Sequence, residues 1–421
     1  MNKQSFKEDN LQDVFGLRKR TSKSIAKKKQ IIDLKDVSEM ISLGTFKLQS
    51  LDSHPIRKKS IYTPNTKEDD IVLSKLNYNI RSIYKVKQSD RHTIVKQIIS
   101  LLKESTPKYI YKLDISDFYE SIKPSLYCKK IFNDSIISSE SNYILKEFLT
   151  AVEHSGVTGL PRGIGLSSTL SELAMRNFDE KISSNINVYF YTRFVDDILI
   201  MTTKRLDLKP DVINHLPQGL NFNWKKTSML QVIRCACDES CRCASAKCKC
   251  FDKCICGKNN LVKTNFNYLG YNFSFNKFLN KDGNGEKISV GMAPSKVSRI
   301  RNRIFLSFKS YERLGNYKLL ENRIKFLTGN HFISKEKHRT DRMKSGVYYN
   351  YIHLTDISAY EELDKFLRKM IFSWKSTKHA LTTCNKGRLN KYSFTSGFNA
   401  KYVTEFSGHQ VNKIKGCWNN G

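Results

Sequence analysis

An apolar run from Tyr191 to Met201 is interrupted near its middle by two adjacent acids, Asp196 and Asp197. The β-branched and aromatic residues of the run predict a strand. Two unneutralised carboxylates in such a setting would repel each other and cost several kcal/mol of desolvation. The arrangement makes physical sense if divalent cations neutralise the acids. The alternative is an exposed turn, where Asp-Asp dipeptides are common.

A third acid, Asp114, ends a similar apolar run that begins at Tyr109. An acid at the end of one strand, together with an Asp-Asp pair between two others, is what a two-metal phosphoryl-transfer site needs. We therefore predict that Asp114, Asp196 and Asp197 are catalytic carboxylates that bind two Mg²⁺ ions.

Five motifs in one order make the chain resemble the reverse transcriptases. They are Asp114–Tyr119 (motif A), Gly159–Ser168 (motif B), Phe194–Asp197 (motif C), Phe222–Thr227 (motif D) and Tyr268–Tyr271 (motif E, the primer grip). Their order across residues 109–275 is specific, although no single motif is. The segments Phe118–Ile122 and Gly346–Tyr351 further resemble the bacterial group associated with antiphage defence and abortive infection.

The resemblance implies an α+β right-hand polymerase with fingers, a ferredoxin-like palm and a helical thumb. The basic helical spacing after Pro294 is typical of a first thumb helix. The expected divisions are a basic N-terminal extension (1–50), fingers (51–108), a palm that includes fingers elements (109–275), a thumb (276–378) and a basic, aromatic C-terminal extension (379–421).

The resemblance also implies roles at the metal site. Asp114 and Asp196 would bind both Mg²⁺ ions, while Asp197 would support the site more weakly and the carbonyl of Ile115 would be a further ligand. Tyr119, beside Phe118, falls where the family places a bulky side chain beneath the sugar. A ring there would collide with a ribose 2′-hydroxyl, which predicts dNTPs over NTPs. The alternative for Tyr119 is a buried aromatic of the palm core.

Motif B predicts a glycine-punctuated turn before a helix from about Ser167 to Phe178. Gly163 would let the backbone approach the base pair closely. Arg162 stands where many retroviral relatives have Gln, so the template-base contact is open.

Three basic residues complete the nucleotide-binding candidates. Lys226 would donate a proton to pyrophosphate, with Lys225 as a substitute. Lys85 and Arg91 would hold the triphosphate, unless they belong to a solvated charge run before an amphipathic helix that ends near Leu102.

Eight of the 11 cysteines lie within residues 234–258, between motifs D and E. They form Cys-x-Cys-x₃-Cys-x-Cys twice, and each repeat offers the four thiolates of a structural zinc site. We expect two Zn²⁺ ions; a shared-thiolate cluster, disulfides and an iron–sulfur centre are the alternatives. Family members have only a short turn here, so no role transfers to this Cys-rich metal knuckle. Its cysteines are Cys235, Cys237, Cys241, Cys243, Cys248, Cys250, Cys254 and Cys256.

The charge balance predicts a polynucleotide partner. Lys and Arg total 72 against 40 Asp and Glu, which gives a formal net charge of +32 and favours binding to phosphate backbones. There is no run of about 18 apolar residues, so we expect a cytoplasmic protein without membrane contact.

Together these features predict an RNA-directed DNA polymerase in antiphage defence. Its partners would be dNTPs, a DNA product and an RNA template, often a dedicated non-coding RNA in the defence group. A second polymerase, an accessory protein or an oligomer are further partners that the resemblance leaves open. The rival functions are template-independent or protein-primed synthesis by the same site, and a catalytically silent RNA-binding scaffold.

Overall fold

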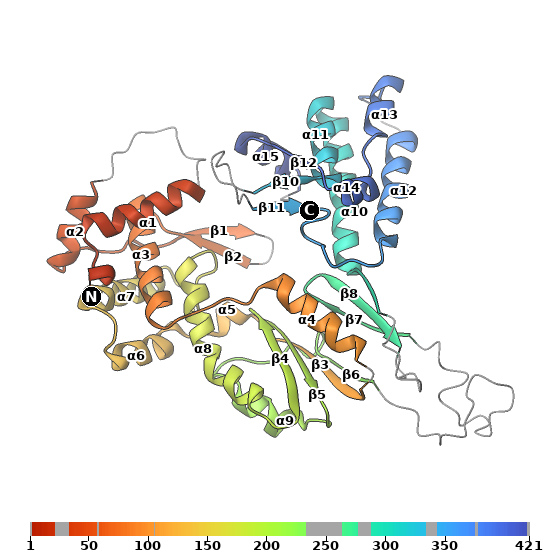
Figure 1. Cartoon of the computed structure of the whole chain (residues 1–421). Coiled ribbons are helices and arrows are strands. Elements are labelled where there is room, and N and C mark those ends of the chain that lie inside the picture. The colour runs from red at the N-terminus through yellow and green to blue at the C-terminus, as the bar shows by residue number, and fades with distance from the viewer. Residues whose placement is uncertain are drawn as a thin grey trace, which may run out of the picture. The chain divides into compact units, whose positions relative to one another are not determined.

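The computed structural model describes residues 2–21, 33–56, 59–104, 106–232, 263–276, 288–333, 343–374 and 378–418 (Figure 1). The described residues form two compact units. The first contains those of 1–20, 26–90 and 107–231, and the second contains those of 21–25, 91–106 and 232–421.

The first unit is built on a four-stranded sheet with the strand order β4-β5-β3-β6. Its strands are β3 (Lys108–Asp114), β4 (Val188–Phe194), β5 (Asp197–Thr202) and β6 (Ser228–Val232). β5 is antiparallel to both β3 and β4 and therefore lies inside the sheet. Ile198, Leu199, Ile200 and Met201 are fully buried. Burial on both faces explains why the run after Asp197 is uninterrupted by polar residues.

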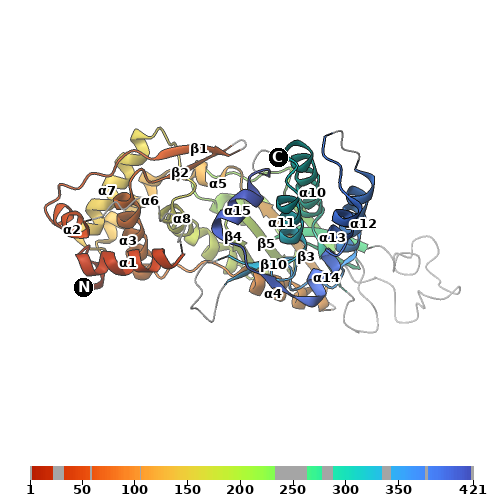
Figure 2. The same cartoon turned by 90° about the horizontal axis from the view of Figure 1, so that it is seen from above.

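Helices surround this sheet. α8 (Gly165–Ser183) contacts β4, and α3 (Lys67–Ile83), α6 (Pro124–Asp134) and α7 (Ser139–His154) form a bundle beside α8 (Figure 2). The unit also contains α1 (Glu8–Thr21), α2 (Leu34–Ser42), α5 (Phe118–Ser121), α9 (Leu208–Asp211), the hairpin of β1 (Asp52–Ile56) and β2 (Lys59–Thr63), and short 3₁₀ turns at Asn2–Gln4 and Ile213–His215. One hydrophobic core joins these helices to β3 and β5.

A buried arginine ties β4 to α8. The guanidinium of Arg193 lies 2.7 Å from a carboxylate oxygen of Glu172 and 2.7 Å from one of Asp179. Both acids belong to α8, and the Arg193 side chain is only 4% exposed. An arginine buried this deeply needs such partners. The pairing therefore fixes the strand that leads into Asp196 against the helix that follows motif B.

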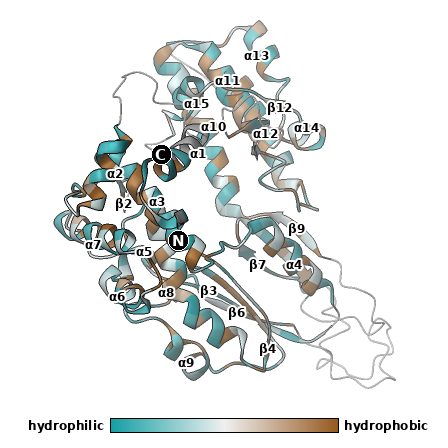
Figure 3. Ribbon diagram, turned by 60° about the vertical axis from the view of Figure 1, so that its left-hand side comes forward, coloured by the Kyte–Doolittle hydropathy of each residue, from teal (hydrophilic) through white to brown (hydrophobic). Residues whose placement is uncertain are grey.

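The second unit combines a three-stranded sheet with a helical domain. The sheet has β7 (Lys263–Tyr268), β8 (Tyr271–Asn276) and β9 (Ser289–Met292) in that order. The helices are α4 (Arg91–Lys103), α10 (Pro294–Leu314), α11 (Tyr317–Thr328), α12 (Ser358–Ser373), α13 (Thr383–Leu389), α14 (Phe394–Ala400) and α15 (Gly408–Lys415). A small sheet of β10 (Asn330–Phe332), β11 (Lys344–Gly346) and β12 (Val403–Thr404) joins them. Hydrophobic and hydrophilic residues alternate around the helices of both units (Figure 3).

The C-terminal residues are part of the helical core of the second unit. Phe394, Ile414 and Trp418 are buried in the same cluster as residues of α10, α11 and α12. The indole N–H of Trp418 donates to the Arg303 carbonyl at 3.1 Å. The range 379–421, expected to form a C-terminal extension, thus contributes aromatic residues to the packing of a domain, which is the more common role of such residues.

α4 also departs from the expected division, which placed it with the fingers at 51–108. Its first residue, Arg91, donates to the Leu269 carbonyl at 2.9 and 2.8 Å and to the Asn350 carbonyl at 2.6 Å. These bonds attach α4 to segments of the second unit that lie far from it in sequence. No described helix is long and apolar enough to cross a membrane.

Candidate active site

The sheet of the first unit brings the three predicted carboxylates together. β3 ends at Asp114 and β5 begins at Asp197, and these two residues are partners in the strand register. Phe194 pairs with Asp197 across the β4–β5 hairpin, so Val195 and Asp196 form its loop. The Ile115 N–H donates to the Asp196 carbonyl at 3.1 Å. Asp114 and Asp196, which are 82 positions apart in sequence, therefore meet at one end of the sheet.

The loop that carries Asp196 has a strained backbone. Val195 has φ = 62°, a left-handed conformation in which glycine is favoured and a β-branched residue is an outlier. Such a conformation costs on the order of 1–3 kcal/mol and persists only where the surroundings enforce it. The pairing of β5 on both sides supplies that enforcement.

Burial destabilises the ionised forms of Asp196 and Asp197. Asp114 is 5% exposed. Desolvation, and secondarily the charge of Asp114, raises the pKa of Asp196. Desolvation, together with the charge of Asp196, raises the pKa of Asp197 to about 6. A bound cation would relieve both effects, because it favours the ionised form of each carboxylate.

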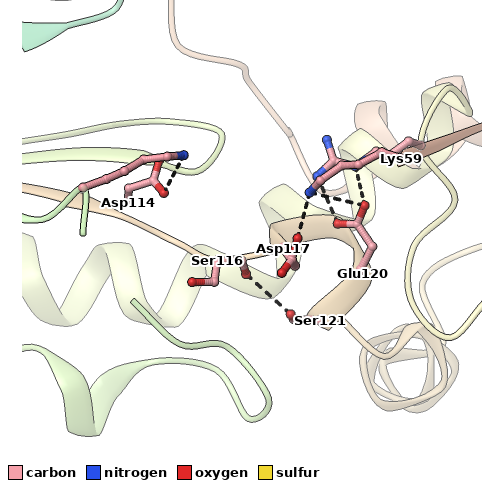
Figure 4. A network of polar contacts seen from close by, with 8 residues as sticks. Lys59, Asp114, Ser116, Asp117, Glu120 and Ser121 are labelled. Carbon is pink, nitrogen blue, oxygen red and sulfur yellow. Dashed lines mark hydrogen bonds and ion pairs between the residues drawn. The ribbon is translucent and has the colours of Figure 1, made fainter. Parts of the chain in front are cut away.

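Lys226 supplies one such positive charge. Its ammonium group lies 3.1 Å from each carboxylate oxygen of Asp114 (Figure 4), and this hydrogen bond raises the pKa of Lys226. The motif D segment is held there by its backbone, because the Asn223 N–H donates to the Asp114 carbonyl at 2.7 Å and Phe222 forms a bridge with Ile115. Of the two candidate lysines, Lys226 is thus the one that pairs with Asp114.

The three acids fit a divalent cation in their chemistry, since carboxylate oxygens are the ligands that Mg²⁺ prefers. Across the described ranges, no three His, Cys, Asp or Glu side chains are already grouped closely enough to hold a metal ion. The ammonium group of Lys226 is bound to both carboxylate oxygens of Asp114, so it would have to leave them before Asp114 could bind a metal ion.

Tyr119 lies on α5, directly after the motif A strand. Its carbonyl accepts a hydrogen bond from the Leu160 N–H at 2.8 Å, and its ring packs edge-on against Phe118 at a centroid distance of 5.4 Å. The Arg162 guanidinium lies 5.1 Å from the centre of the same ring. Phe118 itself is buried, so it supports Tyr119 from the core side.

The motif B turn also contacts the β1–β2 hairpin. The Tyr62 N–H donates to the Arg162 carbonyl at 2.6 Å. Gly163 has φ = 101°, and a side chain there would begin 2.5 Å from the Tyr62 carbonyl oxygen and 2.7 Å from a methyl carbon of Ile61. Only glycine is compatible with this position, because both the conformation and the space exclude a Cβ.

The sequence model of the family described as "Reverse transcriptase (RNA-dependent DNA polymerase)" matches residues 26–273, more than half of the chain. This protein belongs to the reverse transcriptase family. The family assignment accounts for the convergence of the motif A and motif C acids on one sheet edge.

Two curated reverse transcriptases from Escherichia coli are similar over part of their length. The "Retron Ec83 reverse transcriptase" is 32% identical over 103 residues, which cover 23% of this chain and 33% of that protein. The "Retron Ec73 reverse transcriptase" is 29% identical over 119 residues, which cover 26% and 38%. The matches thus cover only 33% and 38% of the length of these relatives.

Among solved structures, the chain is similar to two telomerases. The apo telomerase of Candida tropicalis, truncated from the C-terminal domain, aligns with a TM-score of 0.32 at 14% identity over 53% of this chain and 52% of that one. The telomerase of Candida albicans, in complex with a TWJ fragment of telomeric RNA, aligns with a TM-score of 0.35 at 12% identity over 89% and 62%.

The two basic residues expected to hold the triphosphate belong to different units, Lys85 to the first and Arg91 to the second. Arg91 belongs to the second unit, where its guanidinium donates to carbonyls and lies 4.8 Å from the Tyr271 ring and 5.5 Å from the Tyr351 ring. Lys85 lines an open pocket with Glu172 and Asp179, the partners of Arg193. Their role in holding the triphosphate stays a prediction.

Two residues that were not among the predicted site residues lie beside the site. Lys59 on β2 lies 2.9 Å from Asp117 and 3.6 Å from Glu120, and Glu120 also binds Arg162 (Figure 4). The Lys-x-Ile-x-x-Pro pattern at Lys59 is a weak signal for that residue. Nothing local in the sequence pairs Glu120 with a partner 42 residues away. The eight cysteines predicted to bind Zn²⁺ fall outside the described residues.

Proposed function

We propose that this protein is an RNA-directed DNA polymerase that extends a primer by two-metal nucleotidyl transfer. The observation that carries the proposal is the meeting of Asp114, Asp196 and Asp197 at one sheet edge, in the motif order of the reverse transcriptase family. Membership of the family supports the reaction class, and the presence of three carboxylic acids at one sheet edge supports the two-metal mechanism.

Bound Mg²⁺ would supply the positive charge that activates the primer 3′-hydroxyl and stabilises the triphosphate in the transition state. Asp114 and Asp196 would hold it, with the Ile115 carbonyl as a further ligand and Asp197 in a supporting role. The strained hairpin and the Arg193 ion pairs keep these groups in place before substrate arrives, which is the preorganisation that such a site requires.

Two other side chains act on the nucleotide in this proposal. Lys226 moves from Asp114 toward the triphosphate and donates a proton to the departing pyrophosphate; its raised pKa keeps it protonated until then. Tyr119 lies beneath the sugar and excludes a ribose 2′-hydroxyl. Gly163 lets the motif B backbone approach the nascent base pair.

The test is nucleotide incorporation by purified protein together with the RNA that accompanies it. Wild type and Asp196→Asn are compared in Mg²⁺ with each labelled dNTP or NTP, with and without ribonuclease pretreatment. We expect dNTP incorporation that requires Asp196 and is lost when the RNA is removed. Since this substitution removes one charge and no volume, a folded but inactive variant assigns the effect to chemistry.

The same experiment separates the rival functions. Incorporation that survives removal of the RNA favours template-independent or protein-primed synthesis. Absence of incorporation with every nucleotide favours the scaffold, and in that case Asp196→Asn retains the biological effect of the protein. The intact set of three acids argues against the scaffold, because repelling buried carboxylates are costly to retain without a use.

The template and the biological setting are part of the proposal. Resemblance to the defence group, supported by similarity to two retron reverse transcriptases, favours a dedicated non-coding RNA template and a role in antiphage defence. The net charge of +32 is compatible with a large bound RNA. Sequencing the RNA and the DNA that co-purify with the protein tests this assignment. We expect both in wild type and only the RNA in Asp196→Asn.

We further propose that residues 234–258 bind two structural Zn²⁺ ions through the eight cysteines. The spacing of the repeated Cys-x-Cys pairs supports four thiolates per ion. Closed four-thiolate sites lack an open coordination position, so these ions would not take part in catalysis. Elemental analysis of reduced protein should find about two zinc ions per chain, and fewer than about one excludes the two-site assignment.

A further inference from the structure

Arg162 lies in motif B, but its side chain is bound to motif A. Its Nε donates to one carboxylate oxygen of Glu120 at 2.6 Å, and its Nη2 donates to the other at 3.0 Å. Two parallel bonds of this kind fix the plane of the guanidinium as well as its position. Burial opposes ionisation of Glu120, but the hydrogen bond and charge of Arg162 outweigh it and lower the pKa of Glu120.

The fixed guanidinium lies over the ring of Tyr119, 5.1 Å from its centre. A cation in this position is attracted to the face of the ring. Phe118 contacts the same ring edge-on, and Leu160 holds the Tyr119 carbonyl. The side chain expected beneath the sugar is thus held from two directions, and its backbone from a third.

The backbones of motifs A and B are packed so closely that no side chain fits between them at Gly159. A Cβ at Gly159 would lie 2.4 Å from the Glu120 carbonyl oxygen and 2.5 Å from that of Tyr119. Lys59 extends the cluster to β2, through ion pairs with Asp117 and Glu120 (Figure 4). Glu120 therefore lies between a cation from the β1–β2 hairpin and a cation from motif B, next in sequence to Tyr119.

We propose that the Glu120–Arg162 pair positions the Tyr119 ring and thereby determines how strongly the site excludes ribonucleotides. The inference rests on the proposed polymerase function. Arg162 is a positioning residue in this account, since two of its donor nitrogens are bound to Glu120 and its guanidinium lies over the ring. Without the pair, Tyr119 gains rotamer freedom and can move away from an approaching 2′-hydroxyl.

The test compares selectivity, defined as kcat/KM for a dNTP divided by kcat/KM for the matching NTP. We expect Arg162→Gln to lower this ratio about five- to tenfold, the size expected for loss of a charge-assisted bond that is partly exposed. Glu120→Gln should lower it in the same direction, and Arg162→Lys should retain part of it because the charge over the ring remains. The double variant should be no worse than Arg162→Gln, because the two residues act as a unit.

Lys47 and Glu147 offer a control in the same unit. The Lys47 ammonium group lies 3.0 Å from a carboxylate oxygen of Glu147. Glu147→Gln removes the charge of another ion-paired acid of this unit and should leave the selectivity unchanged. A merely structural role of Arg162 would lower dNTP and NTP use in equal proportion, with the ratio preserved. That result overturns the inference, as does a ratio that changes in Arg162→Gln but not in Glu120→Gln, which would mean that Arg162 contacts the nucleotide directly.

A binding measurement keeps the inference separable from the proposed function. Affinities for dATP and ATP are measured in Ca²⁺ by displacement of a fluorescent nucleotide, for wild type and the same variants. If wild type incorporates nothing but prefers dATP, and both variants weaken that preference, the inference holds while the proposed activity fails. If wild type binds both nucleotides equally, the inference is wrong.

Discussion

Asp197 is destabilised as an anion in the metal-free protein, because burial and the neighbouring charge of Asp196 raise its pKa to about 6. An acid with a raised folded-state pKa holds its proton longer in the folded than in the unfolded chain. Stability from this group is therefore lost as pH rises from its unfolded value near 4 to about 6, and stays lower above that.

Asp197→Asn should accordingly stabilise the metal-free first unit by about 1–3 kcal/mol at a pH near 7.5 and have little effect near pH 4. Thermal unfolding in EDTA at both pH values measures the difference. Excess Mg²⁺ should reduce the difference in stability between Asp197→Asn and wild type at the higher pH, since the cation offsets the repulsion between the acids in wild type. An equal shift in Tm at both pH values would show that the change acts through packing and not through charge.

Lys226 competes with metal for Asp114 in this structure, because its ammonium group lies 3.1 Å from both carboxylate oxygens. Lys226→Met should therefore tighten Mn²⁺ binding to nucleotide-free protein several-fold, as measured by electron paramagnetic resonance titration. Nucleotide incorporation should nevertheless fall by about 10²-fold or more, because a proton donor is lost.

Lys225→Met is the matched control for that prediction. The residue is an exposed neighbour of Lys226 on the same segment, so the substitution removes an equal charge at nearly the same place. Metal affinity and incorporation should change little. If Lys225→Met tightens Mn²⁺ binding as much as Lys226→Met does, the effect comes from net charge. The hypothesis that Lys226 competes with metal for Asp114 is then wrong.

At the scale of elements, β10 brings a histidine into the core of the second unit. The His331 ring stacks on Phe326 of α11 at a centroid distance of 3.9 Å, and its Nδ1 is buried with no hydrogen-bond partner among the described residues. Burial lowers the pKa of His331 to about 4. The neutral form is thus favoured in the fold, and its contribution to stability is present above about pH 6.5 and is lost as pH falls toward 4.

His331→Phe should remove much of the acid sensitivity of this unit between those pH values. We compare the free energy of unfolding of the variant with that of wild type at both pH values. The difference should shift in favour of the variant by about 1–3 kcal/mol between pH 7.5 and pH 4.5. Tryptophan fluorescence reports the unfolding if Trp224, which lies in the first unit, is replaced by Phe in both proteins, because Trp374 and Trp418 both pack in this core. His409→Phe on α15, an exposed histidine of the same unit, should not alter the pH dependence.

Strong local patterns predicted several elements from the sequence. The helix expected from about Ser167 to Phe178 is α8, and the basic helix after Pro294 is α10. Both begin with a local signal, a glycine turn or a proline, followed by helical spacing of apolar residues. The Asp196-Asp197 hairpin was predictable because two acids contradict the apolar strand around them.

Long-range contacts were not predictable from these patterns. The placement of α4 depends on hydrogen bonds from Arg91 to residues more than 170 positions away. The C-terminal aromatics pack into the core because Trp418 meets α10, 115 positions before it. The Glu120–Arg162 pair joins two motifs, and no helical or strand periodicity in the sequence relates their positions. In each case the sequence shows a charge or a ring, but only the tertiary fold supplies its partner.

At the scale of the whole molecule, the dominant property is a net charge of +32 from 72 basic and 40 acidic residues. A single phosphate site does not require such an excess. It is instead the charge expected of a protein that follows a nucleic-acid backbone over many nucleotides and releases its counterions. The excess also implies that affinity depends strongly on ionic strength.

Binding of an RNA–DNA hybrid should therefore weaken steeply with salt. If the protein contacts about six to ten phosphates, the logarithm of the association constant should fall with the logarithm of salt concentration with a slope of roughly −5 to −9. Fluorescence anisotropy between about 0.05 and 0.3 M KCl measures the slope. Asp196→Asn should leave the slope unchanged, because the proposed role of Asp196 is to bind metal and not the phosphate backbone. A slope shallower than about −3 would mean that most of the positive charge faces something other than the hybrid, and repeating the titration with the co-purifying RNA would then show whether that RNA neutralises the excess.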